Sequence, residues 1–206
     1  MKQTKKYLSE RKFYPVFFMI ILTVIFVGVL AVIYHLTQAR VQTYKAHQFQ
    51  KMVLLTLDLP VDQIEQNYNT YITEESQSGF DYYFAKRNDE IIGYCFKIEG
   101  SGLWGMINAL IALNQDFSEL IGFRIIDQNE TPGLGARITE EWFQKQFQDK
   151  KIRHDGELIK FTMVPEDDIP ENNQVQQVTG ATSSTRAVVD MLNKNLVKII
   201  QEFKPE

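Results

Sequence analysis

The chain has 206 residues, with 22 Lys and Arg against 26 Asp and Glu, one cysteine and three histidines. A single cysteine cannot close an intramolecular disulfide, and Cys95 with the scattered His35, His47 and His154 offers no clustered ligands, so we predict no metal site. The net charge of −4 argues against nucleic acid as a partner. An apolar content of 44% is typical of a globular protein, and the length suits one domain with an appendage.

The N-terminal part of the chain has the pattern of a membrane anchor. Residues 1–12 carry five Lys or Arg and a single acidic residue, whereas 13–36 contain no Asp, Glu, Lys or Arg. As a helix, about 22 apolar residues at ~1.5 Å each span roughly 33 Å, enough to cross a hydrocarbon core of ~30 Å. Phe13 and Tyr14 at one end and Tyr34 at the other flank the run, as aromatic residues do at membrane interfaces. We therefore predict a transmembrane helix at 13–36 in a lipid bilayer.

Two other interpretations of the apolar run are weaker. A cleaved signal peptide has a shorter apolar core and small residues before its cut site, which the sequence from Tyr34 to Thr37 lacks. A buried core helix is rarely apolar on every face over such a length. By the positive-inside rule, the basic residues 1–12 stay in the cytoplasm. The predicted location is the inner (plasma) membrane, crossed once, with the C-terminal domain outside the cytoplasm.

A juxtamembrane helical region is predicted over 37–78. Residues 37–59 contain no Gly or Pro and are rich in helix formers, so the helix should continue until Pro60 stops it. One or two further helical turns are expected within 61–75. Residues 79–206 then form the predicted extracytoplasmic domain.

The domain 79–206 alternates apolar strands with amphipathic helices. Strands are predicted at 81–87, 91–99, 106–113, 120–127 and 158–164. Residues 140–147 and 184–203 repeat apolar side chains at helical intervals and predict helices. Pro165 ends the last strand and opens a polar loop that runs through Gln177. The predicted fold class is α+β, an antiparallel sheet with packed helices.

A glycine-rich segment, Gly100-Ser-Gly-Leu-Trp-Gly105, follows one of the predicted strands. It matches G-x-G-x-x-G formally, but the residues after it have the composition of a strand rather than of the helix that a dinucleotide-binding unit needs. The segment therefore predicts a tight loop in which glycines allow unusual backbone angles. Trp104 either packs inward or offers a flat face to a planar ligand, and both interpretations fit the sequence equally.

A second segment, Glu130-Thr-Pro-Gly-Leu-Gly135, lies between a predicted strand and a predicted helix. Pro132 followed by Gly133 predicts a type II turn. Glu130 and Thr131 lie on the approach to this turn, and Gly135 allows backbone to come close to a ligand. The segment is either a plain turn or part of a binding site.

The third segment, Thr179-Gly-Ala-Thr-Ser-Ser-Thr185, immediately precedes the C-terminal helix. Its hydroxyl side chains are suited to capping that helix. The same geometry presents unpaired N–H groups and the positive end of the helix dipole to an anion such as phosphate, with the Thr182 hydroxyl within reach. From the residues alone, a cap and a phosphate site are equally good interpretations.

Taken in order, an N-terminal anchor, GLWG, ETPGLG and a hydroxyl-GAT motif resemble the FMN-binding domain family. This family includes the G subunit of the Rnf electron-transport complex and the C subunit of the sodium-translocating NADH:quinone reductase. The resemblance covers essentially the whole chain. It implies FMN attached through a phosphoester to the last threonine of the motif, which is Thr182 here, by a flavin transferase that works outside the cytoplasm.

The resemblance also implies a set of flavin-site residues. The expected cofactor-binding residues are Thr182, Thr179, Gly180, Ala181, Ser183, Leu103, Trp104, Glu130, Thr131, Gly133 and Leu134. Arg186 either helps to neutralise the phosphate or is a surface residue. No catalytic acid or base is implied, because the flavin carries the redox chemistry. The chain departs from the family pattern at Gln176, where an aspartate usually stands three residues before the Ser/Thr.

The function that the resemblance implies is electron relay through covalent FMN within an ion-translocating membrane complex, with the other membrane subunits as partners. The length and the insert-free core favour the Rnf protein, whereas Leu103 and Trp104 lean toward the C subunit of the quinone reductase. An anchored interaction module without a cofactor is the alternative from a different class.

Overall fold

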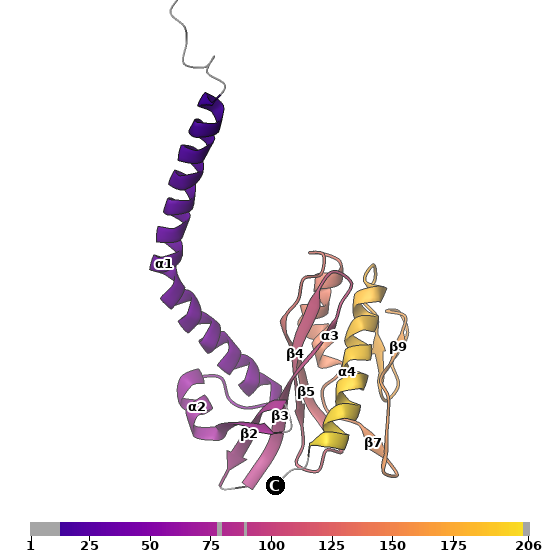
Figure 1. Cartoon of the computed structure of the whole chain (residues 1–206). Coiled ribbons are helices and arrows are strands. Elements are labelled where there is room, and N and C mark those ends of the chain that lie inside the picture. Colours follow the sequence, from indigo (N-terminus) through magenta and orange to yellow (C-terminus); the bar gives the residue numbers. More distant parts are fainter. Residues whose placement is uncertain (1–12, 78–79, 89, 204–206) are drawn as a thin grey trace, which may run out of the picture. The chain divides into compact units, whose positions relative to one another are not determined.

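The computed structural model describes residues 13–77, 80–88 and 90–203. The chain divides into two units, Met1–Ala46 and His47–Glu206, and each is described by itself. The basic tail predicted at 1–12 lies outside the described residues. Figure 1 shows the elements in chain order.

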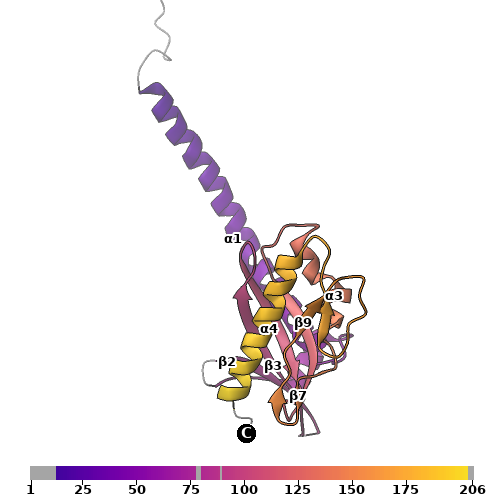
Figure 2. The same ribbon diagram turned by 90° about the vertical axis from the view of Figure 1, so that its right-hand side faces the viewer.

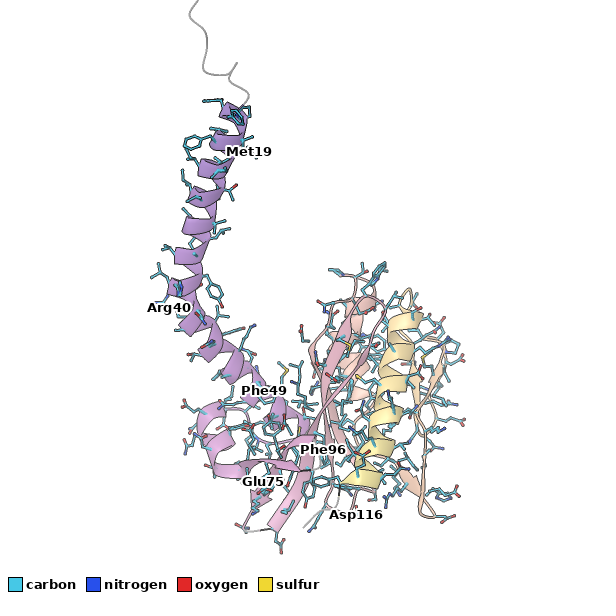
Figure 3. The ribbon with its side chains drawn as sticks, viewed as in Figure 1. Met19, Arg40, Phe49, Glu75, Phe96 and Asp116 are labelled. Atoms are coloured by element: carbon cyan, nitrogen blue, oxygen red, sulfur yellow. The ribbon has the colours of Figure 1, made fainter. Side chains whose placement is uncertain are left out.

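Helix α1 (Tyr14–Thr56) makes up the described part of the first unit and continues into the second. Its apolar side chains in the first unit are exposed to solvent, as Met19 is in Figure 3. The helix is long and apolar enough to cross a membrane. The predicted anchor and the juxtamembrane helix are therefore one continuous helix, which ends before Pro60 as expected.

The second unit is built on an antiparallel sheet of six strands, and consecutive strands are neighbours from β1 to β6. The strands are β1 (Ile72–Gln77), β2 (Phe80–Arg87), β3 (Glu90–Ser101), β4 (Met106–Leu113), β5 (Glu119–Asp127) and β6 (Lys150–Lys151). The strands predicted at 81–87 and 91–99 are present and pair with each other, as do those predicted at 106–113 and 120–127. The predicted α+β fold class is confirmed.

Both faces of the sheet are buried, and successive residues point to opposite faces. Helix α4 (Thr182–Glu202) lies along one face of the sheet, as Figures 1 and 2 show. On this face, side chains such as Tyr94, Phe96 and Ile98 of β3 pack in a core with side chains of α4. On the other face, Cys95 of β3 belongs to a second core. This second core contains the end of α1 and side chains of α2 (Ile64–Tyr71). The domain therefore has three layers, which explains why its strands are apolar on both sides.

The remaining elements differ in part from the sequence predictions. They are η2 (Gly135–Thr139), α3 (Glu141–Lys145), β7 (Arg153–His154), β8 (Glu157–Leu158), β9 (Thr162–Val164) and β10 (Gln174–Gln176). The helix predicted at 140–147 is present but shorter. The helical turns expected within 61–75 are present as α2, whereas β1 lies at the end of the predicted helical region 37–78, because its pairing with β2 stabilises the extended form. Strand β10 lies in the predicted polar loop and pairs in parallel with β9.

The strand predicted at 158–164 is interrupted over residues 159–161, between β8 and β9. The side-chain amide of Asn193 in α4 donates to the Phe161 carbonyl at 2.9 Å, and its oxygen accepts the Phe161 N–H at 2.8 Å. Because both backbone groups of Phe161 are bonded to a helix side chain, this residue cannot join a strand ladder. The buried Phe161 ring anchors the segment in the core instead.

Candidate functional site

A cavity of about 490 Å³ lies where the β3–β4 loop, the turn after β5 and the start of α4 meet. These three segments correspond to the three motifs identified in the sequence. The lining residues are Leu103, Trp104, Glu130, Thr131, Leu134, Gly135, Gly180, Ala181, Thr182, Ser183 and Ser184. The volume falls in the range of about 300 to 1,000 Å³ that is usual for small-molecule sites.

Glu130 connects all three segments. Its side chain is 4% exposed, and its Oε1 accepts hydrogen bonds from the backbone N–H groups of Leu103 at 2.8 Å and Trp104 at 3.1 Å. Its Oε2 accepts a hydrogen bond from the hydroxyl of Ser184 in α4. Because a buried carboxylate needs hydrogen-bond donors, these contacts hold the loop, the turn and the helix in one arrangement.

Glycines make room for this carboxylate. A Cβ atom at Gly102 would overlap Oε1 of Glu130, and a Cβ at Gly135 would lie 2.8 Å from Oε2. The same Cβ at Gly135 would also collide with the hydroxyl of Ser184. Gly102 of the first motif and Gly135 of the second are therefore required by close packing around Glu130.

Two other glycines are required by backbone conformation. The Leu134 N–H donates to the Thr131 carbonyl at 3.1 Å, and Gly133 has φ of +73°, as predicted for a type II turn at Pro132 and Gly133. Gly180, directly before α4, has φ of +78°. A residue with a side chain is strained at such angles, so both turns favour glycine.

The start of α4 is not capped by a side chain. Ala181 occupies the N-cap position, and Thr182 is the first helical residue, two positions earlier than predicted. The hydroxyls of Ser184 and Thr185 are buried and bonded to Glu130 and to the Ala181 carbonyl. Thr182 and Ser183 are exposed and line the cavity. The uncapped N–H groups and the helix dipole therefore suit an anion, and the Thr182 hydroxyl lies beside them.

Exposed apolar side chains form the rim of the cavity. Trp104 is 70% exposed, Leu103 is 57% exposed and Leu134 is 49% exposed. Trp104 is therefore not packed inward, which was one of its two interpretations. A planar apolar ligand in the cavity would cover these side chains, and aromatic stacking would stabilise it.

The segment before the cavity is held by polar contacts. The Thr179 N–H donates to Oε2 of Glu166 at 2.7 Å, and hydrogen bonding from Thr179 lowers the pKa of the Glu166 carboxyl. The side-chain amide of Gln176 donates to the carbonyls of Glu166 at 2.9 Å and Asp168 at 2.8 Å. The side chain of an aspartate at position 176 would have no N–H to donate, so Gln176 makes two hydrogen bonds that an aspartate could not make.

Nine of the eleven expected flavin-site residues line one cavity, and Thr179 and Gly133 do not. Arg186 is exposed and is absent from the lining. Ser184 was not predicted as a site residue. It lies four residues before Val188, on the buried face of α4. A polar residue on an apolar stripe needs a buried partner, and that signal points to Glu130. Among the described residues there is no cluster of three His, Cys, Asp or Glu able to hold a metal ion.

Comparison with known proteins identifies the family. Residues 102–197 match the FMN-binding domain model. The chain is 31% identical over 176 residues to the G subunit of the ion-translocating oxidoreductase complex of Methanosarcina acetivorans, and the match covers 85% of this chain and 87% of that protein. The chain belongs to the FMN-binding domain family. This FMN-binding protein is also 36% identical over 108 residues to the G subunit of the proton-translocating ferredoxin:NAD(+) oxidoreductase complex of Clostridium ljungdahlii, covering 52% of this chain and 54% of that one.

A solved structure has the same fold. The crystal structure of the C subunit of the Na(+)-translocating NADH-quinone reductase from Parabacteroides distasonis aligns with a TM-score of 0.66 at 22% identity. The alignment covers 78% of this FMN-binding protein and 93% of that chain. The shared architecture is the α+β domain described above.

The residues of the cavity fit FMN. Its volume suits a small molecule, the start of α4 suits a phosphate, and Leu103, Trp104 and Leu134 offer apolar surface to a ring. This agreement rests on three independent features of one site.

Proposed function

We propose that this chain is a membrane-anchored electron-transfer subunit of an Rnf-type ion-translocating complex and carries FMN covalently on Thr182. The observation that carries the proposal is the position of Thr182. This exposed residue begins α4, lines the cavity and adjoins the uncapped N–H groups. A phosphoester at this hydroxyl would leave the phosphate oxygens at the positive end of the helix dipole.

The other lining residues have separate roles in this proposal. The uncapped start of α4 binds the phosphate, and the rim of Leu103, Trp104 and Leu134 contacts the flavin ring. Glu130 holds the loop that carries Trp104 in place. When bound, FMN supplies the redox chemistry, and the protein supplies attachment, orientation and the local electric field.

The relatives support the Rnf-type complex over the quinone reductase. The G subunit from Methanosarcina acetivorans is 31% identical over 85% of this chain, whereas the C subunit of the quinone reductase from Vibrio alginolyticus is 25% identical over 74% of it. The remaining membrane proteins of such a complex are the proposed partners, and a flavin transferase is the proposed maturation enzyme.

The proposed topology follows from the charge pattern and the apolar helix. Helix α1 has the length and composition of a membrane span, and the basic residues 1–12 precede it. By the positive-inside rule, the FMN-binding domain lies outside the cytoplasm.

Intact-chain mass spectrometry and flavin fluorescence on a denaturing gel test the attachment. The wild-type chain should carry the added mass of one FMN and give a fluorescent band, and Thr182→Ala should abolish both. Ser183→Ala is the matched control, because Ser183 is also an exposed hydroxyl residue that lines the cavity. A fluorescent band of unchanged intensity in Thr182→Ala would refute attachment at this residue, and a colourless wild-type protein would favour a cofactor-free interaction module.

A further inference from the structure

Glu130 is the one ionisable side chain among the described residues that line the cavity. Within the described part of the chain, the ion pairs involve other residues, so no cation pairs with it. Its oxygens accept hydrogen bonds from neutral groups, which are two backbone N–H groups and the hydroxyl of Ser184. An ionised carboxylate can only accept hydrogen bonds, so this pattern suits a charged group. The cavity therefore contains a buried negative charge without a cation beside it.

The hydrogen bonds of Glu130 do not by themselves require this charge. An amide side chain of the same length would accept from the N–H groups of Leu103 and Trp104 through its oxygen. The hydroxyl of Ser184 can rotate to accept a hydrogen bond from the amide nitrogen. Since burying a charge without a cation is less favourable than burying a hydrogen-bonded amide, loop geometry alone does not explain a carboxylate at position 130.

We propose that the Glu130 carboxylate holds the reduction potential of the bound flavin low, an inference that rests on the function proposed above. Uptake of two electrons and one proton leaves the flavin ring one charge more negative than the oxidised ring. A fixed negative charge in the same cavity repels that added charge, and because Glu130 is buried, solvent screens the repulsion less than it would at the surface. Charge near the ring is one of the means by which proteins tune flavins.

The test is a reductive titration of the full-length protein, produced with its flavin transferase and solubilised in detergent. Dithionite supplies the electrons, and the flavin absorbance is read against a reference dye of known potential. Glu130→Gln removes the charge and keeps the size and the hydrogen-bonding oxygen. In this variant the ratio of reduced to oxidised flavin at a given solution potential should be at least tenfold higher than in the wild type. This corresponds to a positive shift of the reduction potential of about 30 mV for a two-electron couple.

Two further variants separate charge from loop position. Glu130→Asp keeps the charge, but its shorter side chain places the carboxylate farther from the N–H groups of Leu103 and Trp104. The reduction potential of the flavin in this variant should shift less than half as far as in Glu130→Gln. Ser184→Ala removes a hydrogen bond that stabilises the carboxylate, so it should shift the potential downward. Glu141→Gln is the matched control for loss of a carboxylate, because Glu141 is a largely exposed side chain paired with Lys145. Its potential should equal that of the wild type.

An unchanged potential in Glu130→Gln would overturn the proposal. So would equal upward shifts in Glu130→Gln, Glu130→Asp and Ser184→Ala, because loop geometry would then explain the effect. If Glu130→Gln does not fold or does not hold flavin, Glu130→Asp tests the proposal. A rise in its reduction potential that corresponds to a tenfold higher ratio of reduced to oxidised flavin, with the charge retained, would contradict the proposal. A wild-type chain without flavin would instead refute the proposed function, which distinguishes the two failures.

Discussion

The hydroxyl of Ser184 donates a hydrogen bond to the carboxylate of Glu130, and this contact joins residues 54 positions apart in the sequence. Both residues are buried. Ser184 lies in the first turn of α4, and Glu130 begins the turn after β5. The bond therefore fixes the helix start, where we place the phosphate, relative to the loop that carries the apolar rim.

Loss of this contact should destabilise the domain. Ser184→Ala leaves Oε2 of Glu130 buried without its donor, and an unsatisfied buried polar group of this kind reduces the free energy of unfolding by about 1–3 kcal/mol. Urea unfolding followed by circular dichroism measures the change. Ser183→Ala is the control, because an exposed hydroxyl should contribute within about 0.5 kcal/mol. Equal stability of the two variants would contradict the role of the hydrogen bond.

Thr179 should matter less than Thr182 for flavin loading. The backbone N–H of Thr179 donates a hydrogen bond to the Glu166 side chain, and Thr179→Ala keeps this bond. This variant should therefore lose a hydroxyl contact and still load more than half as much flavin as the wild type. Band fluorescence on a denaturing gel, normalised to protein, gives the ranking. Loading as low as in Thr182→Ala would show that Thr179 has a direct part in attachment.

Trp104 should contribute to the flavin environment and little to stability. Because its side chain is 70% exposed, Trp104→Ala should change the free energy of unfolding of the cofactor-free protein by less than about 0.5 kcal/mol. In the loaded protein, loss of stacking should increase the fluorescence of native flavin while the covalent band stays. Emission spectra before and after denaturation separate the two effects. Unchanged native emission would place the ring away from Trp104.

The domain should lose stability at alkaline pH. Burial, followed by the nearby Glu74 carboxylate, raises the pKa of Tyr68 from 10.0 to about 12. Because the fold favours the protonated phenol, this contribution is complete below pH 10 and is lost as pH rises toward about 12. Tyr68→Phe has no phenol to titrate, so its free energy of unfolding should fall less steeply over that interval. Burial also raises the pKa of Tyr83, so the free energy of unfolding of Tyr68→Phe should still fall with rising pH.

A parallel fall of stability in Tyr68→Phe and the wild type would contradict this assignment. The comparison uses chemical unfolding at several pH values between 9 and about 12, with the cofactor-free protein. Tyr44→Phe is the control, because Tyr44 is 65% exposed.

Much of the architecture could be predicted from local sequence. The apolar run of α1, the apolar strands β2 to β5 and the amphipathic α4 each have a pattern that is visible in a short window. Strand β1 could not be predicted in this way, because its polar residues are extended only through pairing with β2. The break at Phe161 likewise depends on Asn193, a residue from a distant helix.

The same distinction between local sequence and distant contacts applies to the candidate site. By itself the sequence determined the three motifs and the turn at Gly133, because turn chemistry and helix starts depend on a few neighbouring residues. The resemblance of these motifs to the FMN-binding domain family pointed to Thr182 as the threonine proposed for attachment. Only the tertiary structure decided that Trp104 faces outward, that Gln176 holds a loop in place and that the buried carboxyl of Glu130 is hydrogen-bonded to Ser184. Those properties depend on contacts between segments far apart in the chain, and such contacts form only when the sheet and α4 pack together.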